Sequence, residues 1–440
     1  KNYWNYYWLL NIMAIYLAII LLIGLLSKKA SNYDDYIFAS RKLTLPAFIA
    51  TFVTTWYGGI LEIGRFTFHN GIITWIIFGL FYYFSALILL KYIAPKIHSN
   101  SMETIPDYFH KYFGYIPGVI SSLIVILISS PAPYLMIFAT IFMHVYDIPY
   151  LYSILIGLFF SVAYLLFGGF KSIIRTDKIQ FLLMYAGFIM ILLNLYNNFG
   201  GLDFLISKLP IGHLSFKTSI PVGYLFSWSL ISMITLIDPN IFQRVYAVKN
   251  KKTLDQGIII SIFFWMIFDF LSITTGLYAA AIIPPESLLA SPYLALSNLV
   301  LPPFLNTIFI ISLLSIVMST IDSFTFTSSI TIGREIKNNK SKIFNIQIGL
   351  VLTSILSIII CLSFKQVIDI WYLFGSIAAA TILVPLIKIL YNPNYKASYP
   401  TTTILLPLIV STLWILCGSP MGVDCMYPGI LASLVMNYLS

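Results

Sequence analysis

Residues 54–65 read Thr54-Thr55-Trp56-Tyr57-Gly58-Gly59-Ile60-Leu61-Glu62-Ile63-Gly64-Arg65, within an apolar run from about residue 45 to 65. Glycine weakens the interior of a helix, so the adjacent glycines predict a break in a helix at this point. An unwound turn exposes backbone carbonyls that can coordinate a cation. Close packing of helices through small residues is the structural alternative.

Apolar runs of similar length recur along the whole chain. The 440 residues are 59% hydrophobic and 9% charged, whereas an ordinary soluble domain carries about 25% charged residues. Such a chain cannot cover its own surface with polar groups. Runs of about 20 apolar residues are long enough to cross a bilayer. The composition therefore predicts an all-α integral membrane protein, because backbone in contact with lipid must find its hydrogen bonds within helices or closed barrels.

Breaking the runs at charged residues, prolines and glycines predicts the membrane spans. The first run is too long for a typical signal-peptide core and has no small-residue cleavage site after it, so we expect it to be a span. No loop is long enough for a separate soluble domain, so residues 1–440 are expected to form a single transmembrane domain. About thirteen spans are expected, near residues 7–26, 45–65, 73–95, 117–144, 149–169, 178–197, 222–237, 256–282, 302–332, 345–363, 367–390, 402–418 and 425–439.

The basic residues divide unequally between the two sides of the predicted membrane. Of the 25 Lys and Arg residues, twenty fall in one set of alternate connections, and the other set holds only Lys1, Arg65, Lys208, Lys217 and Lys365. Basic residues favour cytoplasmic loops. We therefore expect a cell (inner) membrane protein with its N-terminus outside and its C-terminus in the cytoplasm. The spread of these residues over short loops does not indicate nucleic-acid binding, despite a net charge of +9.

Four acidic side chains fall within or beside the predicted spans, where an ionisable group is costly and points to function: Glu62, Asp177, Asp269 and Asp322. A salt bridge, or a side chain that reaches the interface, is the structural alternative, above all for Asp177, which lies near Arg175 and Lys178. Glu62 and Arg65 are three residues apart and would face one another on a helix. A mutual pair is therefore weighed against a role in binding.

The predicted span at residues 302–332 carries a run of polar side chains in the segment Ile316-Val317-Met318-Ser319-Thr320-Ile321-Asp322-Ser323. Ser319, Asp322 and Ser323 share one helical face. A small hard cation prefers such oxygen ligands. Serine and threonine also bond back to the preceding helical turn, so a structural role is the alternative.

Catalytic motifs do not stand out. The His residues form no HExxH pattern, the three cysteines form no CxxC pair, and neither a GxSxG nor a phosphate-binding loop is present. Asp238 followed by Pro239 is a standard helix start. The sequence therefore predicts that the protein is not an enzyme and has no organic cofactor.

Several short segments resemble the sodium/solute symporter family, whose members transport solutes such as proline, pantothenate, sialic acid and glucose. They occur in the family's order from about residue 33 to 335 and are Asp35-Tyr36-Ile37-Phe38-Ala39-Ser40-Arg41, Thr104-Ile105-Pro106-Asp107-Tyr108 with Gly114, Ser130-Pro131-Ala132-Pro133-Tyr134-Leu135, Phe167-Gly168-Gly169-Phe170-Lys171, Thr176-Asp177-Lys178-Ile179-Gln180, Asp238-Pro239 with Gln243-Arg244, and Met318-Ser319-Thr320-Ile321-Asp322-Ser323.

The resemblance implies a LeuT-like five-plus-five inverted repeat that works by alternating access around a site at the midplane. Residues 1–43 would form an extra first helix and its loop. Residues 44–198 would form the first repeat, residues 199–395 the second repeat with an outer loop, and residues 396–440 two extra C-terminal helices.

The resemblance also implies sodium ligands. Family members hold one sodium ion between the broken second span and the ninth, and the matching ligands would be the carbonyls of Thr54, Tyr57 and Ile316 and the hydroxyls of Ser319 and Thr320. Some members hold a second sodium ion, for which the matching residues are Asp177, Ser319, Asp322 and Ser323.

Residues for the solute do not carry over from the family, so they are chosen by type and position. The candidates for solute binding or an outer gate are Glu62, Arg65, Asp269 and Trp228, and further aromatic residues that either line a pocket or pack are Tyr82, Tyr83 and Trp371. We expect a monomer in the lipid bilayer that imports a small polar organic solute, such as a sugar, a sugar acid or an amino acid, with sodium as the coupling ion. The alternatives are a proton-coupled carrier of the same fold, with Asp177, Asp269 or Glu62 as the proton site, and a polytopic membrane enzyme or sensor.

Overall fold

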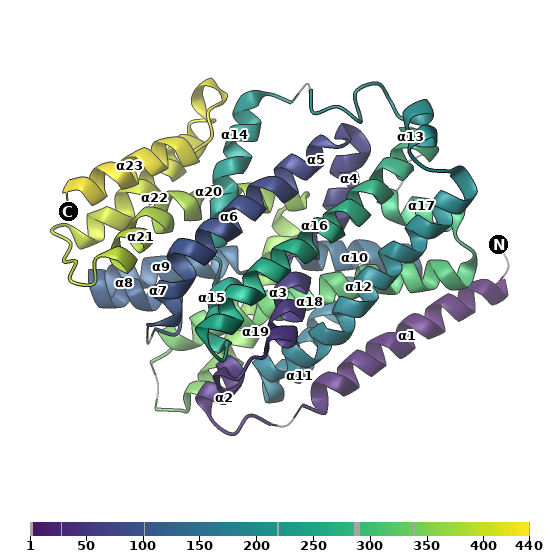
Figure 1. Ribbon diagram of the computed structural model, residues 1–440. Helices are drawn as coiled ribbons and strands as arrows, with labels where there is room; N and C mark the ends of the chain where they lie inside the picture. The colour runs from purple at the N-terminus through teal and green to yellow at the C-terminus, as the bar shows by residue number, and fades with distance from the viewer. Residues whose placement is uncertain are drawn as a thin grey trace.

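Apolar helices make up nearly all of the structure (Figure 1). The computed structural model describes residues 3–27, 29–100, 102–217, 220–285, 291–337 and 339–439, with side chains from residue 11 onward. The described residues contain no strand, and the bridge between Leu43 and Val248 is isolated. The predicted all-helical fold is confirmed.

The α-helices have the bounds α1 (Tyr3–Leu25), α2 (Tyr33–Phe38), α3 (Leu45–Thr54), α4 (Ile60–Asn70), α5 (Ile73–Trp75), α6 (Phe81–Ile88), α7 (Ala94–His98), α8 (Ile105–Phe113), α9 (Tyr115–Ile128), α10 (Ala132–Tyr146), α11 (Tyr150–Gly168), α12 (Phe170–Phe199), α13 (Leu202–Lys208), α14 (Val222–Ile231), α15 (Pro239–Ala247), α16 (Lys251–Ile282), α17 (Pro292–Val300), α18 (Pro303–Glu335), α19 (Lys342–Ser363), α20 (Val367–Ala378), α21 (Val384–Tyr391), α22 (Pro400–Leu416) and α23 (Met426–Leu439). Short 3₁₀ or π turns link or interrupt them at η1 (Ala39–Arg41), η2 (Tyr57–Gly59), η3 (Ile76–Leu80), η4 (Leu89–Ile93), η5 (Ser232–Ile237), η7 (Ala379–Leu383) and η8 (Pro420–Gly422).

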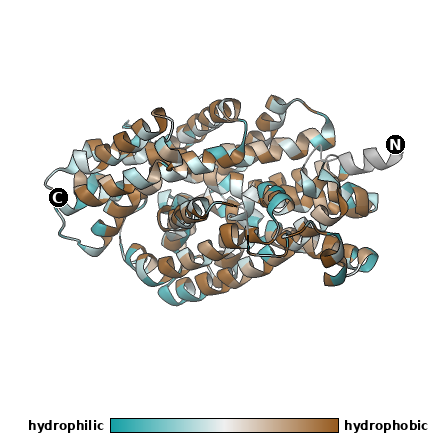
Figure 2. Ribbon diagram, turned by 90° about the horizontal axis from the view of Figure 1, so that it is seen from above, coloured by the Kyte–Doolittle hydropathy of each residue, from teal (hydrophilic) through white to brown (hydrophobic). Residues whose placement is uncertain are grey.

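Within the described residues, ten helical segments are long and apolar enough to cross a membrane: Leu45–Asn70, Ile73–His98, Tyr115–Tyr146, Tyr150–Gly168, Phe170–Phe199, Val222–Ala247, Lys251–Ile282, Pro303–Glu335, Lys342–Ser363 and Val367–Tyr391. Shorter apolar helices at Asn11–Leu25, Pro400–Leu416 and Met426–Leu439 coincide with the other three expected spans. The total of thirteen spans stays a prediction. Seen from above, apolar residues occur all round the bundle (Figure 2). Leu182 and Phe270 are each 67% exposed, as expected for side chains that face lipid.

One span begins earlier than the sequence predicts. The expected start was residue 178, whereas α12 begins at Phe170, directly after Gly169, whose φ of 54° ends α11. The basic side chains of Arg175 and Lys178 are exposed, so they lie on the outer face of α12 and do not end the helix. Asp177, on the opposite face, is completely buried within this helix.

The helix break expected near Gly58 and Gly59 is confirmed. The α3 helix ends at Thr54, the 3₁₀ turn η2 covers the two glycines, and α4 begins at Ile60. A Cβ atom on Gly58 would lie 2.6 Å from the side chain of Thr320, and one on Gly59 would lie 2.1 Å from the ring of Trp371. The glycines therefore serve both expected purposes, since they allow the break and the close approach of other helices to it.

A second interrupted segment lies further along the chain, where α14 passes through the 3₁₀ turn η5 and α15 begins at Pro239. The Asp238 side chain accepts hydrogen bonds from the backbone N–H groups of Asn240 (2.7 Å) and Ile241 (3.3 Å), so the expected helix start is confirmed. The turn η2 packs against α18, as does α15 after the second interruption, and the side chains of α18 are buried almost throughout. In Figure 1, α3, α15 and α18 lie in the middle of the bundle, while α1 lies along one outer side and α22 and α23 lie at the opposite end.

Candidate functional site

The end of α3 meets the middle of α18 around the hydroxyl group of Thr320. Thr320 Oγ1 lies 3.1 Å from the carbonyl oxygen of Thr55, 3.2 Å from that of Ile316 and 3.5 Å from that of Thr54. Thr320 is completely buried. Three carbonyl oxygens and a hydroxyl therefore converge at the helix break, which is the type of ligand set that a small hard cation requires. Thr54, Ile316 and Thr320 were all predicted as sodium ligands, and the structure brings them together.

The neighbouring hydroxyl, that of Ser319, faces a carboxylate on α12. Ser319 Oγ donates to Asp177 Oδ1 at 2.6 Å, and the hydroxyl of Thr51 on α3 donates to Asp177 Oδ2. The carbonyl of Tyr57, another predicted ligand, accepts the N–H of Ile60 within the turn η2. We call Thr320 Oγ1 and the carbonyl oxygens of Thr54, Thr55 and Ile316 the Thr320 cluster. Ser319 precedes Thr320 in α18 and its hydroxyl faces Asp177, so both expected sodium sites include this one hydroxyl.

Arg244 on α15 extends its guanidinium group into the same region. Its Nη2 atom donates to the hydroxyls of Thr51 (2.8 Å), Thr55 (2.6 Å) and Ser323 (2.8 Å) and lies 3.7 Å from Asp177 Oδ2. The Arg244 side chain is 1% exposed and that of Asp177 is 0% exposed. The ionic partner of Asp177 is therefore Arg244, a residue distant in sequence.

Asp322, the fourth residue of the expected second sodium site, points toward a different helix. The hydroxyl of Tyr164 on α11 donates to Asp322 Oδ2. Asp177 and Ser319 are in direct contact, and Ser323 joins them through Arg244. The predicted second site is thus only partly assembled around one point.

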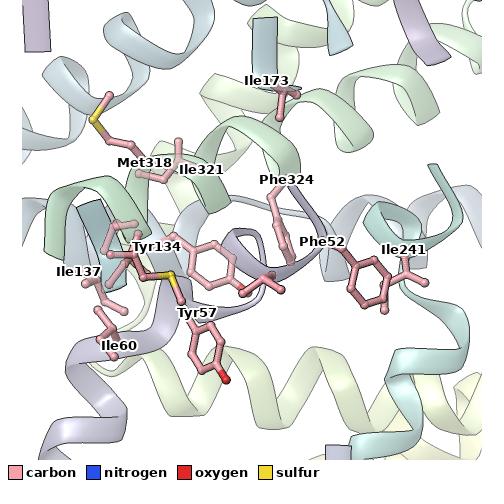
Figure 3. Packing of buried hydrophobic residues seen from close by; sticks show 14 of the residues in the cluster. Phe52, Tyr57, Ile60, Tyr134, Ile137, Ile173, Ile241, Met318, Ile321 and Phe324 are labelled. Atoms are coloured by element: carbon pink, nitrogen blue, oxygen red, sulfur yellow. The ribbon is translucent and has the colours of Figure 1, made fainter. Parts of the chain in front are cut away.

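A cavity of about 160 Å³ lies beside the helix break. Aromatic side chains dominate its wall, and Figure 3 shows Tyr134 and Phe324 beside the broken helix, with ring centroids 4.7 Å apart. Its aromatic lining is Phe52, Trp56, Tyr57, Phe78, Tyr82, Tyr134, Trp228, Phe324, Trp371 and Phe374. Its polar lining is Thr55, Ser130, Asp238, Asn240 and Arg244. The end of α3 therefore borders both the cavity and the oxygen atoms that converge around Thr320.

Of the predicted solute or gate residues, Trp228 lines this cavity, while Glu62, Arg65 and Asp269 are absent from its described lining. Asp269 Oδ1 accepts from Tyr57 at 2.9 Å, and Asp269 Oδ2 accepts from Tyr83. Glu62 and Arg65 lie 3.5 Å apart, with 7% and 48% of their side chains exposed. Each of these three charged side chains thus contacts another side chain and is not itself part of the cavity lining.

The comparison with known proteins covers the helix break, α18 and the residues that line the cavity. Residues 36–393 match the sequence profile of the sodium:solute symporter family. The chain belongs to the sodium:solute symporter family. It is similar to the sodium/pantothenate symporter of Haemophilus influenzae (27% identical over 54% of this chain and 55% of that protein) and to the osmoregulated proline transporter OpuE of Bacillus subtilis (25% identical over 71% and 67%). The sodium/proline symporter of Staphylococcus aureus is 24% identical over 71% of this chain and 64% of that protein. The chain thus aligns with about half to two thirds of the length of these relatives.

Solved structures support the fold. A Na⁺-coupled sialic acid symporter in its substrate-bound outward-open state superimposes with a TM-score of 0.78 at 17% identity, covering 97% of this chain and 95% of that one. MhsT in complex with L-phenylalanine gives a TM-score of 0.57 at 14% identity, covering 92% and 99%. The predicted LeuT-like fold is thereby confirmed. The boundaries of the two repeats stay predictions.

Sequence reasoning missed three members of the site: Thr51, Thr55 and Arg244. Thr51 lies in α3 and Thr55 directly follows this helix; because they are four residues apart, they share one face of the helix end, and this spacing is a signal that the sequence contains. Arg244 was part of a segment that resembles the family, but no feature of the sequence indicates where its side chain points.

Proposed function

We propose that the protein is a sodium-coupled secondary active symporter that imports a compact polar organic solute by alternating access. The convergence of three carbonyl oxygens on Thr320 Oγ1 at the helix break carries this proposal. A sodium ion placed there would touch both the broken helix and α18. Binding of the ion would therefore favour one arrangement of the broken helix and α18. Because the cavity lies beside both, this arrangement would set the affinity of the cavity for the solute.

The cavity supports a small solute with an apolar face. Its volume of about 160 Å³ is below the range of about 300–1,000 Å³ that is typical of sites for drug-sized ligands. Aromatic walls would pack against the apolar part of the solute, and the few polar groups would orient it. Among a sugar, a sugar acid and an amino acid, these features favour a solute of amino-acid size. Two of the similar proteins named above are proline transporters.

The distribution of basic residues supports an orientation with the N-terminus outside and the C-terminus in the cytoplasm of a cell (inner) membrane. We assign the sodium ligands that the family resemblance implies, which are the carbonyls of Thr54, Tyr57 and Ile316 and the hydroxyls of Ser319 and Thr320. Of these, Thr54, Ile316 and Thr320 lie together around Thr320 Oγ1. The functional unit is proposed to be a monomer.

The purified protein tests this function in two steps. Its melting temperature should rise with sodium chloride but not with potassium chloride at equal ionic strength, because a ligand that binds only the folded state stabilises it. The transported solute, sought in a panel of amino acids, sugars and sugar acids, should then raise the melting temperature further, and should do so only when sodium is present. In proteoliposomes, a sodium gradient should drive uptake of the solute found in this way. Uptake driven by a proton gradient without sodium would support the proton-coupled alternative instead.

A further inference from the structure

A second pocket, of about 290 Å³, lies between the segment that leads into α3 and the start of α12. Its described lining contains no acidic side chain and four basic ones, which are Lys42, Lys171, Arg175 and Lys178. Lys42 lies in the connection between η1 and α3, whereas the other three lie in α12. The fold therefore gathers basic side chains from two distant parts of the sequence around one hollow.

Most of the positive charge around this pocket has no counter-charge. Lys171 Nζ lies 2.6 Å from Asp35 Oδ2, so the charge of this lysine is balanced. Arg175 Nη1 donates to a backbone carbonyl just after α1 at 2.8 Å, which leaves its charge unbalanced. Within the part of the chain that the structure describes, no acidic side chain pairs with Lys42, Arg175 or Lys178, and all three are exposed. The pocket therefore attracts an anion.

The face of α12 that carries the basic side chains continues as an apolar stripe. Arg175 and Lys178 are followed at helical spacing by three large apolar side chains. These are Leu182, Ile189 and Leu193, which are 67%, 44% and 59% exposed. In a membrane protein, exposed side chains of this kind contact acyl chains. A ligand that fits both parts of this face has an anionic group joined to hydrocarbon, which describes a phospholipid better than a free anion.

We propose that this pocket binds the phosphate headgroup of an anionic phospholipid, whose acyl chains lie along the exposed stripe of α12. Basic pockets between membrane helices on the cytoplasmic side are suited to such headgroups, and the four basic side chains belong to the connections expected on that side. Three unbalanced positive charges match a headgroup with two phosphates, as in cardiolipin, better than one with a single phosphate. The inference does not depend on which ion or solute the protein transports.

The wild-type protein, purified in detergent and freed of lipid, gives the first test. Cardiolipin added in mixed micelles should raise its melting temperature, because a ligand of the folded state stabilises it. Phosphatidylglycerol should do so at higher concentration, whereas phosphatidylcholine and inorganic phosphate should have no effect. Equal stabilisation by phosphatidylcholine would contradict a site for an anionic headgroup. Equal stabilisation by inorganic phosphate would contradict the lipid and indicate a site for the free anion.

The second test removes two of the unbalanced charges together, with Lys42→Gln and Lys178→Gln. Both lysines are exposed, so this double variant should keep the wild-type melting temperature in lipid-free detergent. The cardiolipin concentration for half-maximal stabilisation should rise about 25-fold, since each lysine near an anionic lipid contributes about fivefold to binding.

The matched control is Lys111→Gln with Lys396→Gln, which removes the same charge from exposed lysines outside the described lining of the pocket, in connections expected on the same side of the membrane. It should leave the cardiolipin titration unchanged. An equal loss in both double variants would show general attraction between charge and lipid and would overturn the proposed site. If the Lys42 and Lys178 variant does not fold, the lipid series on the wild-type protein decides.

Discussion

Two buried carboxylates of this protein, Asp177 and Asp269, differ in what surrounds them. Asp177 is 0% exposed and Asp269 is 3% exposed, and each accepts hydrogen bonds from two side-chain hydroxyls. The donors to Asp177 are the short side chains of Thr51 and Ser319, beside a helix break and 3.7 Å from a guanidinium nitrogen. The donors to Asp269 are two tyrosines, and no ion pair of Asp269 occurs among the described residues.

Burial alone therefore does not identify a carboxylate that takes part in ion coupling. Tyr57 also donates to the backbone carbonyl of Trp265 at 2.9 Å, so the Asp269 cluster joins the turn η2 to α16 and α6 and holds the break in position. Asp177 instead binds the hydroxyls of Thr51 and Ser319, next to the oxygen atoms around Thr320. A carboxylate near several Ser and Thr oxygens and a cation is therefore the better candidate for a role in ion coupling.

Asp177→Asn should have the largest effect on stability. It leaves the Arg244 guanidinium buried without its counter-charge, and breaking such a buried pair costs about 3–5 kcal/mol. It should also weaken sodium binding by about 10–100-fold, because Asp177 orients the ligand Ser319. The measurement is the melting temperature in detergent together with a sodium titration. A variant as stable as wild type would show that the pair does not hold this region together.

Asp269→Asn should have a smaller effect on stability, about 1.5–3 kcal/mol, because it weakens hydrogen bonds to a charged group and strands no cation. Its sodium affinity should stay close to that of wild type, which makes it the matched partner of the Asp177 variant in the same assays. A loss of sodium affinity as large as that of Asp177→Asn would contradict the inference that Asp177, and not Asp269, takes part in ion binding.

The Glu62 and Arg65 pair should show the smallest effect. Arg65 is about half exposed, and exposed ion pairs contribute about 0–1 kcal/mol. A double-mutant cycle with Glu62→Gln and Arg65→Gln should therefore give a coupling energy below about 1 kcal/mol. The same proteins should be tested for solute binding, since the pair was predicted to belong to the solute site or its outer gate. A stable double variant with normal binding and uptake would rule that role out.

The sequence alone predicts the parts of the molecule that depend on local pattern. Each expected span lies on helical structure, because length and apolarity decide which segments can cross a bilayer. The span expected at residues 117–144 consists of two helices, however, since α9 ends at Ile128 and α10 begins at Ala132. The break at Gly58 and Gly59 was also predictable, since glycine weakens a helix wherever it occurs. The spacing of Ser319 and Asp322 predicts a shared helical face, and both are buried on α18.

The partners of these residues could not be predicted, because they depend on how distant segments pack. Arg175 and Lys178 are the basic residues nearest to Asp177 in sequence, yet both are exposed, and the partner is Arg244 on α15. Asp322 shares a face with Ser319 but bonds to Tyr164 on another helix. The cavity lining comes from many segments, so its residues could be chosen only by type.

The proposed sodium site is tested most directly by the sodium affinity of Ser319→Ala and Thr320→Ala, measured by thermal-shift titration of the purified proteins. Each change removes one oxygen that we assign to the ion, and losing a bond to a charged group costs about 1.5–3 kcal/mol, which corresponds to about 10–100-fold weaker binding. The control is Ser312→Ala, which removes a buried hydroxyl on the same helix whose one hydrogen bond among the described residues is to the carbonyl of Phe309. We predict a large loss of sodium affinity in both site variants and none in the control. Unchanged affinity in both site variants would contradict the proposed sodium site.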